Sequence, residues 1–317
     1  MMIANSNRLT IGVVIPTYCA AHHLEYCLPQ VLASPLKPSV LIVDSSSKDN
    51  TVDLAQKMGA ETLVIPQKEF NHGATRELAR KHINTDIVVM MTQDAYPESS
   101  DFLQHLVTPL SEGKASVSYA RQVPRKGADF FEAFPRQFNY PDKSQIRSIE
   151  DLETYGSYTF FCSNSCTAWF NAALDEIGGF FPTLVSEEHF AAAQLLEKGH
   201  RIAYVAESVV YHSHRYSLLQ EFQRYFDIGY ARRLYIKKGK ELFFHSRQDK
   251  KHGSQLVKAM LKELKAKKPL AIPYAILQIA AKYFGYKIGT IGPKLPVKIA
   301  RLLSGQNYYW SSIYNNK

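Results

Sequence analysis

A carboxylate and two imidazoles stand at the ends of apolar runs, where side chains can reach a common site. Asp94 follows the apolar run 87–91, and a carboxylate there can coordinate a divalent cation that bridges two phosphates. His212 and His214, two residues apart after the apolar run 201–211, offer imidazole nitrogens to the same ion. The alternatives are a helix N-cap for Asp94 and hydrogen-bonded surface positions for the histidines, and the sequence leaves them open.

Two adjacent glutamates, Glu187 and Glu188, precede a predicted helix over residues 189–198. A carboxylate that faces an acceptor hydroxyl can serve as a general base, which typically contributes about 10²–10⁴-fold to a rate. Acidic residues are also common at helix N-termini, where the helix dipole stabilises them without any catalytic role. The sequence does not decide which of the two glutamates would be the base.

A second group of polar residues suits a nucleotide diphosphate. Arg76, on a helix predicted to begin at Gly73, has the forked guanidinium that pairs with phosphate, and a helix N-terminus favours an anion. Asp44 can accept a hydrogen bond from a base or a ribose. A surface turn and a helix cap are the structural alternatives. The candidates for binding such a nucleotide are Pro16, Thr17, Asp44, Ser46, Arg76 and Gln93.

Short apolar runs that alternate with amphipathic segments are the elements that must position these residues. Such alternation predicts a parallel sheet with helices on both faces, whose ligands bind at the carboxyl ends of the strands. The expected strands are residues 11–16, 40–43, 62–65 and 87–91, and the helices between them 22–33, 50–58 and 73–82. Further along, we expect helices over 97–113 and 189–198, strands over 115–121, 161–169 and 201–211, an amphipathic, aromatic segment over 218–238, and an irregular loop over 122–158 near the acceptor.

The charge of the chain is divided unevenly. The net charge is +9, yet residues 231–317 hold 19 Lys and Arg against 3 Asp and Glu, whereas residues 1–230 hold 19 against 26. A basic tail binds phosphate, either on nucleic acid or on anionic lipid. Because the charge is confined to the tail and no recognition motif occurs, we expect no nucleic-acid partner.

The basic tail also contains a short apolar run, residues 270–281, after a cluster of lysines. These 12 residues are too few to span a bilayer, so we expect an amphipathic segment lying on an anionic membrane surface. The alternative is a helical pair packed on the catalytic domain. Four cysteines without a CxxC pair indicate free thiols, and we predict a cytoplasmic protein, peripheral on the inner face of the plasma membrane.

Taken in chain order, these motifs resemble those of the family 2 glycosyltransferases, which have the GT-A fold. The residues that carry the resemblance are VVIPTY at 13–18, VDSSSKDNT at 43–51, TQDA at 92–95, and GGF at 178–180 followed by Glu187 and Glu188. They are similar to the family's first strand, its nucleotide-binding stretch, its DxD metal position and its acceptor loop with the catalytic base. FNHGATR at 70–76, together with QDA at 93–95, is similar to the rhamnosyltransferase branch, whose donor is dTDP-L-rhamnose.

The resemblance implies an α/β protein of the GT-A fold, with a mostly parallel nucleotide-binding sheet flanked by helices and a C-terminal helical, basic appendage. The implied domains are residues 1–238, with a nucleotide-sugar half 1–115 and an acceptor half 116–238, and a basic amphipathic helical tail 239–317. The implied reaction is an inverting transfer of a sugar, L-rhamnose in this branch, from a nucleotide diphosphate to a saccharide or polyprenyl-linked saccharide in cell-surface polysaccharide synthesis.

The resemblance also assigns roles to the candidate residues. The implied roles are metal binding for Asp94 with His212 or His214, base contacts for Thr17 and Asp44, a diphosphate contact for Arg76, and catalysis for Glu188 beside Glu187. The metal would be Mg²⁺ or Mn²⁺. Two positions depart from the family pattern: Glu188 stands where aspartate is usual, and Gln93 replaces the first acid of the DxD motif.

Two other functions are open as alternatives, a sugar-nucleotide nucleotidyltransferase and a non-catalytic, membrane-associated carbohydrate-binding protein. The first would need a glycine-rich phosphate loop after the first strand, which residues 17–20 lack. The second would leave Asp94 and Glu188 without a role. A dinucleotide oxidoreductase would need GxGxxG after the first strand, and that motif is also absent there.

Overall fold

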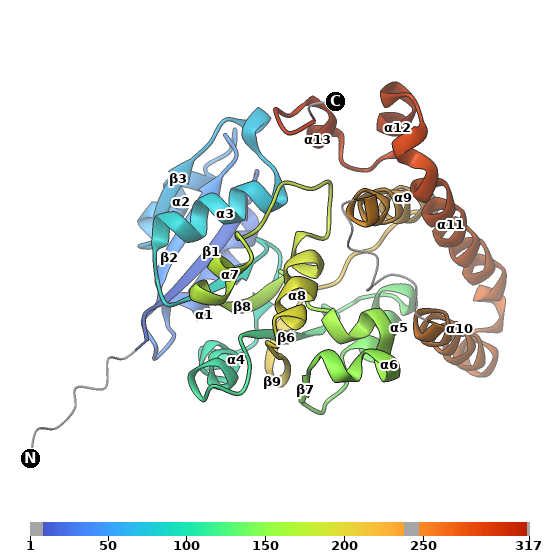
Figure 1. The fold of residues 1–317 in the computed structure, drawn as a ribbon, viewed down its shortest axis with the longest axis horizontal. Helices are drawn as coiled ribbons and strands as arrows, with labels where there is room; N and C mark the ends of the chain where they lie inside the picture. Colours follow the sequence, from blue (N-terminus) through green and yellow to red (C-terminus); the bar gives the residue numbers. More distant parts are fainter. Residues whose placement is uncertain (1–8, 238–246, 316–317) are drawn as a thin grey trace, which may run out of the picture.

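The computed structural model describes residues 9–237 and 247–315. In these residues one mixed sheet of nine strands forms the centre, with helices on both faces and a C-terminal helical region along one side (Figure 1). The strands follow the order β3-β2-β1-β4-β8-β6-β9-β5, and β7 pairs with β9. Their bounds are β1 Ile11–Thr17, β2 Ser39–Asp44, β3 Glu61–Val64, β4 Ile87–Met91, β5 Tyr96–Pro97, β6 Val117–Val123, β7 Gln145–Arg147, β8 Cys166–Phe170 and β9 Ile202–Tyr211.

The directions of the strands bring distant residues to one edge. β1 pairs in parallel with β2 and β4, and β2 does so with β3, whereas β8 runs antiparallel between β4 and β6. β6 is parallel to β9, so both run in the same direction as β1. The carboxyl ends of β1 to β4, β6 and β9 therefore lie at the same edge, and the predicted mostly parallel α/β sheet is confirmed.

The first strand is buried on both faces, as its uninterrupted apolar sequence predicts. In β1, Val14 packs in a core shared with α3, α7 and α8, while Val13 and Ile15 pack in a core shared with α1, α2 and α4. The helices are α1 Ala21–Leu32, α2 Thr51–Lys57, α3 His72–Ile83, α4 Phe102–Ser111, α5 Phe130–Asn139, α6 Leu152–Tyr155, α7 Asn171–Glu176, α8 Glu187–Glu197, α9 Leu218–Lys237, α10 Arg247–Lys267, α11 Ile272–Ile291, α12 Val297–Leu303 and α13 Asn307–Ser311.

Residues 122–158 correct the sequence-based expectation of an irregular loop. They contain α5, β7 and α6, and β7 pairs with β9. Arg147 of β7 is fully buried and donates hydrogen bonds to the Phe161 carbonyl (2.7 Å) and the Tyr119 hydroxyl (2.8 Å). Pro135 lies inside α5, and a proline within a helical pattern normally predicts the end of a helix, which is why the sequence does not predict α5.

The predicted C-terminal helical region is confirmed as α10 to α13, and the predicted boundary between residues 238 and 239 lies outside the described residues. α11 lies along α9 in the same direction, with Gly285 against Phe222 and Gly289 against Phe226. A Cβ atom on Gly289 would lie 2.2 Å from the Phe226 carbonyl oxygen, so the two backbones touch. Within residues 9–237 and 247–315, no helix has the length and apolar character needed to cross a membrane.

The close approach of α9 and α11 predicts opposite effects for the same substitution at two glycines. Gly289→Ala forces the helices apart and should lower the free energy of unfolding by about 1–3 kcal/mol, the usual cost of overpacking. At Gly253 in α10 an added Cβ meets nothing within 4 Å, so Gly253→Ala should be neutral or stabilising by up to about 1 kcal/mol. Denaturant unfolding compares the two variants, and equal effects would contradict this packing.

Candidate active site

A cleft of about 570 Å³ lies at the edge where the parallel strands end. Most of the residues singled out in the sequence line it, and they come from both halves of the sheet. They are Pro16, Thr17, Arg76, Gln93, Asp94, Glu187, Glu188, His212 and His214. Asp44 and Ser46 do not contribute to its lining.

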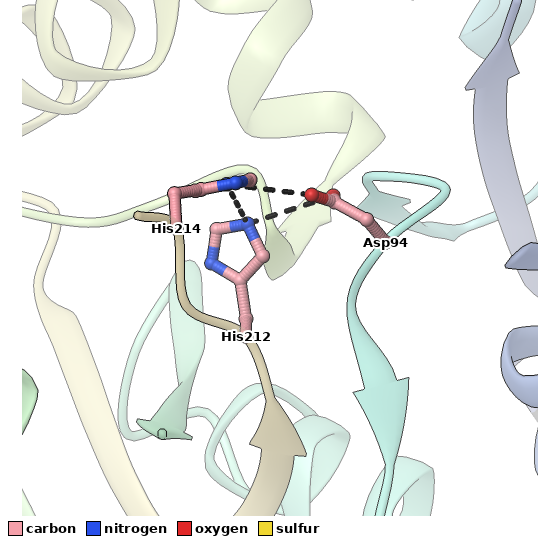
Figure 2. Close-up of side chains that lie close together, drawn as sticks. All are labelled: Asp94, His212 and His214. Carbon is pink, nitrogen blue, oxygen red and sulfur yellow. Dashed lines mark hydrogen bonds and ion pairs between the residues drawn. The ribbon is translucent and has the colours of Figure 1, made fainter. Parts of the chain in front are cut away.

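Asp94, His212 and His214 form one cluster in the wall of the cleft. Asp94 follows β4 and the histidines follow β9, and Figure 2 shows both rings directed toward the carboxylate. The Asp94 carboxylate oxygens lie 3.5 Å from His212 Nε2 and 3.3 Å from His214 Nε2. The two Nε2 atoms are 2.9 Å apart. The fold thus brings three potential metal ligands from distant parts of the sequence to one point.

The spacing of the two imidazole nitrogens and the carboxylate suits a common cation. Ligands about 2.1–2.3 Å from an ion and at right angles to each other lie about 3.0–3.3 Å apart. The two Nε2 atoms are 2.9 Å apart, and those of His212 and His214 lie 3.5 Å from Oδ1 and 3.3 Å from Oδ2 of Asp94, which is close to this range. Because three protein ligands leave positions open on a six-coordinate ion, the cluster could hold a divalent cation that also binds substrate oxygens.

The surroundings keep both histidines neutral, which is the form that binds a metal. Burial lowers the pKa of His212, and burial together with the neighbouring His212 lowers the pKa of His214 to about 3. His212 Nδ1 lies 2.9 Å from the Oε1 atom of Gln122. Since a carbonyl oxygen can only accept, Nδ1 carries the proton and Nε2 is left to face the cluster.

Glu187 and Glu188 begin α8, two residues earlier than the sequence predicts. Ser186 before them has a left-handed backbone (φ 69°), which turns the chain into the helix. Glu187 is buried in an ion pair with Arg76 and accepts a hydrogen bond from the Asn164 side chain (3.1 Å). Burial acts to raise the pKa of Glu187, but the charge of Arg76, together with His72 and the hydrogen bonds that Glu187 accepts, outweighs it, so this pKa is lowered and Glu187 is ionised.

Glu188 lines the cleft, and 17% of its side chain is exposed. Burial raises the pKa of its carboxyl well above the ordinary value, and the negative charge of Glu187 raises it further. A higher pKa makes the ionised carboxylate a better proton acceptor near neutral pH. Because Glu187 is already committed to Arg76 and Asn164, Glu188 is the better placed of the two for proton transfer.

Several candidates for nucleotide binding are already bonded to other groups of the protein. Asp44 is fully buried and accepts a hydrogen bond from Thr17 Oγ1 (3.0 Å), and Ser46 Oγ donates to the Ile65 carbonyl (2.8 Å). The contacts of Asp44 and Ser46 with a nucleotide therefore stay predictions. The same holds for a contact between Arg76 and a diphosphate, since Glu187 occupies part of the Arg76 guanidinium.

Gln93 makes a pair of contacts that a carboxylate could not make. Its Oε1 atom accepts a hydrogen bond from the Tyr18 backbone N–H (2.9 Å), and its Nε2 atom donates to the Tyr18 carbonyl (3.4 Å). An ionised carboxylate only accepts hydrogen bonds, so aspartate or glutamate would lose the second contact. This gives a physical reason for the departure from DxD, because the amide ties the turn after β1 to the turn after β4.

Sequence reasoning missed several residues that line the cleft. They are Gln67, Ser163, Asn164, Arg224, Gln306 and Tyr308. Arg224 lies on α9, and Gln306 and Tyr308 lie at the start of α13. Gln67 reaches the cleft from the segment that follows β3, and Ser163 and Asn164 reach it from the segment that precedes β8. Gln306 and Tyr308 reach it only because the C-terminal segment folds back toward the sheet.

The family comparisons agree with this geometry. Residues 12–178 match the model of glycosyl transferase family 2. The chain is 36% identical over 316 residues to the O-antigen chain rhamnosyltransferase RfbN of Salmonella typhimurium, covering 96% of this chain and 97% of that protein. It is 34% identical to the O-antigen chain rhamnosyltransferase WbaN of Salmonella anatum, covering 95% and 96%.

Solved structures of low sequence identity share the fold. The mannosyltransferase PcManGT from Pyrobaculum calidifontis, in complex with GDP-Man and Mn²⁺, has a TM-score of 0.63 at 16% identity, covering 92% of this chain and 89% of that one. S. aureus TarS 1–349 in complex with UDP-GlcNAc has a TM-score of 0.54 at 12% identity, covering 90% and 92%. The chain therefore belongs to glycosyltransferase family 2 and has the GT-A fold.

Proposed function

We propose that this chain transfers L-rhamnose from dTDP-L-rhamnose to a polyprenyl-linked saccharide in O-antigen synthesis, with inversion at the anomeric carbon. The relatives RfbN and WbaN, both O-antigen chain rhamnosyltransferases matched along almost their whole length, support the sugar and the pathway. The observation that carries the proposal is the cleft itself, which a three-ligand cluster and the Glu187–Glu188 pair line together.

The cluster of Asp94, His212 and His214 would hold Mg²⁺ or Mn²⁺. Two nitrogen ligands make Mn²⁺ the better fit, because Mg²⁺ is a harder cation that prefers oxygen. Bound there, the cation would neutralise negative charge on the departing diphosphate. Gln122 supports this use by fixing the His212 tautomer, with the Nδ1–H toward its own oxygen.

Glu188 is the proposed general base. Its carboxylate accepts the proton of the acceptor hydroxyl while the acceptor oxygen forms a bond to the anomeric carbon. The bond between that carbon and the diphosphate oxygen breaks on the opposite face, which inverts the configuration. Glu187 is the proposed positioning residue, since its charge beside Glu188 raises the basicity of that carboxylate and its ion pair with Arg76 holds it in place.

We also propose that α11 and α12 lie on an anionic membrane surface, where a lipid-linked acceptor would be found. α11 packs with its small residues inward: Gly285 and Gly289 face α9, whereas Leu277 and Phe284 are each 56% exposed. A helix of a water-exposed domain normally turns its large apolar side chains toward the core. The outward face of α11 therefore indicates an apolar environment beside it.

The charge around this face favours a bilayer as that environment. Leu302 of α12 is 78% exposed, and residues 264–317 contain 9 Lys and Arg and no Asp or Glu. Apolar side chains flanked by basic ones suit the interface of an anionic bilayer. Figure 1 shows α11 and α12 at the outer edge of the molecule, where a flat surface can reach them.

The transfer reaction tests the proposed function directly. With Mn²⁺, dTDP-L-rhamnose and a lipid-linked saccharide, the wild-type chain should transfer rhamnose, and Glu188→Gln should lower kcat by about 10²–10⁴-fold. Binding of dTDP-L-rhamnose to this variant should be unchanged. Glu25→Gln, at an exposed glutamate of α1 outside the cleft, is the matched control. Absence of transfer by the wild type would refute the function, and full activity of Glu188→Gln would refute the base.

The pH dependence of kcat separates the roles of the two glutamates. Below its pKa Glu188 is protonated and cannot accept a proton, so kcat should fall as pH decreases, with a midpoint well above the ordinary glutamate value. Glu187→Gln removes the negative charge that raises this pKa, so the midpoint should move to lower pH while activity at high pH is retained in part. An unchanged midpoint, in a variant that melts like the wild type, would contradict this coupling.

Vesicle flotation tests the membrane surface. The wild type should bind vesicles that contain phosphatidylglycerol, and the binding should weaken with added salt. Leu277→Glu should weaken binding by roughly tenfold or more, because burial of a leucine side chain is worth about 1.5–3 kcal/mol. Leu78→Glu on α3 makes the same change at another exposed leucine and should have no effect. Equal binding by both variants would exclude α11 as the membrane surface.

A further inference from the structure

The C-terminal segment returns from α12 to the other side of the molecule and contacts the start of α3. The Tyr308 hydroxyl lies 2.6 Å from His72 Nε2, and the Ile313 backbone N–H donates to the Lys68 carbonyl (3.2 Å). Figure 1 shows α13 close to the N-terminal half of the sheet, away from α12. Tyr308 and His72 both line the cleft.

Independent anchors on both sides of Tyr308 fix its position. The Gly305 backbone N–H donates to the Asp227 carboxylate of α9 (3.0 Å). Trp310 is buried, and its ring meets that of Tyr230 edge to face, with centroids 5.4 Å apart. Because α13 is held by a hydrogen bond before Tyr308 and by core packing after it, the phenol is anchored in the cleft wall.

The contacts of His72 determine what the Tyr308 hydroxyl can do. Burial lowers the pKa of His72 to about 4, so the ring is neutral and has one N–H. Its Nδ1 atom faces the Arg76 guanidinium (3.4 Å), a group that only donates. Nδ1 is therefore the acceptor, and the N–H at Nε2 points to the Tyr308 oxygen. Burial raises the pKa of Tyr308, so its hydroxyl keeps a hydrogen that it can donate into the cleft.

We infer that Tyr308 binds the nucleotide-sugar donor by giving this hydrogen bond to one of its oxygens. The neighbours of Tyr308 place it on the donor side of the cleft. Its ring packs edge to face on Phe70, with centroids 5.1 Å apart, and Phe70 and His72 follow β3 in the half of the sheet that contains β1 and β2. The carboxyl ends of such parallel strands bind nucleotides. The inference rests on the proposed function for the identity of the donor.

Removal of one hydroxyl tests this contact. Tyr308→Phe keeps the ring packing and should raise both the KM and the Kd for dTDP-L-rhamnose, measured with Mn²⁺, by about three- to tenfold, as expected for one hydrogen bond. The kcat should stay within about twofold, and the KM for the acceptor should not change. Tyr309→Phe makes the same change one residue along, outside the cleft lining, and should leave all these values unchanged.

Three results would overturn the inference. One is an unchanged donor Kd in Tyr308→Phe. The others are an equal loss in Tyr309→Phe and a loss in Tyr308→Phe accompanied by a lower melting temperature, because both would indicate a structural role. If the wild type neither binds nor uses dTDP-L-rhamnose, the proposed function itself fails. If it does both and Tyr308→Phe behaves like the wild type, only the role of Tyr308 fails.

Discussion

A buried ion pair between Arg76 and Glu187 joins the two helices on which the site depends. Arg76 belongs to α3 and Glu187 begins α8. Because the pair keeps Glu187 ionised, a negative charge stays beside Glu188 and sustains the raised pKa of that carboxyl. The same guanidinium faces His72 Nδ1, so the His72 N–H at Nε2 donates to the Tyr308 oxygen and the one hydroxyl hydrogen of Tyr308 is left for the cleft. Leaving one partner of such a pair unpaired inside a protein costs about 3–5 kcal/mol, so α3, α8 and the C-terminal segment depend on one another.

The cation cluster depends on a different constraint, the pairing of a very short strand. Asp94 leaves β4 and the histidines leave β9, with β8 and β6 between these two strands. Two residues after Asp94, β5 begins and pairs with the end of β9, where Tyr96 lies opposite Tyr211. Since Tyr211 directly precedes His212, this pairing carries Asp94 across the edge of the sheet to the histidines. The Asp94 carboxylate then meets the two neutral imidazoles although it lies far from them in the sequence.

Features that depend on neighbouring residues can be predicted from the sequence, whereas features that depend on contacts between distant residues cannot. β1 and β4 are short apolar runs, so their positions and the polar residues that follow them can be predicted from the pattern of apolar residues along the chain. β5 and β9 pair over only two residues and lie far apart in the chain, so no sequence pattern predicts their pairing. Arg147 is charged and would therefore be expected at the surface. It is buried because the fold places carbonyl acceptors around its guanidinium. Tyr308 is missed for the same reason, since its partner His72 lies 236 residues away.

A short stretch of chain links the proposed membrane surface on α12 to the proposed donor contact at Tyr308. Leu302 is exposed at the end of α12, Ser304 is buried, and Tyr308 lines the cleft. Between them Asp227 of α9 holds the turn, and α9 is also the helix against whose backbone α11 packs at Gly289. A bilayer that covers α11 and α12 would therefore be coupled to the cleft through one rigid helix. The acceptor carried by that bilayer and the donor held by Tyr308 would then approach at a fixed separation, which is what a direct displacement between them requires.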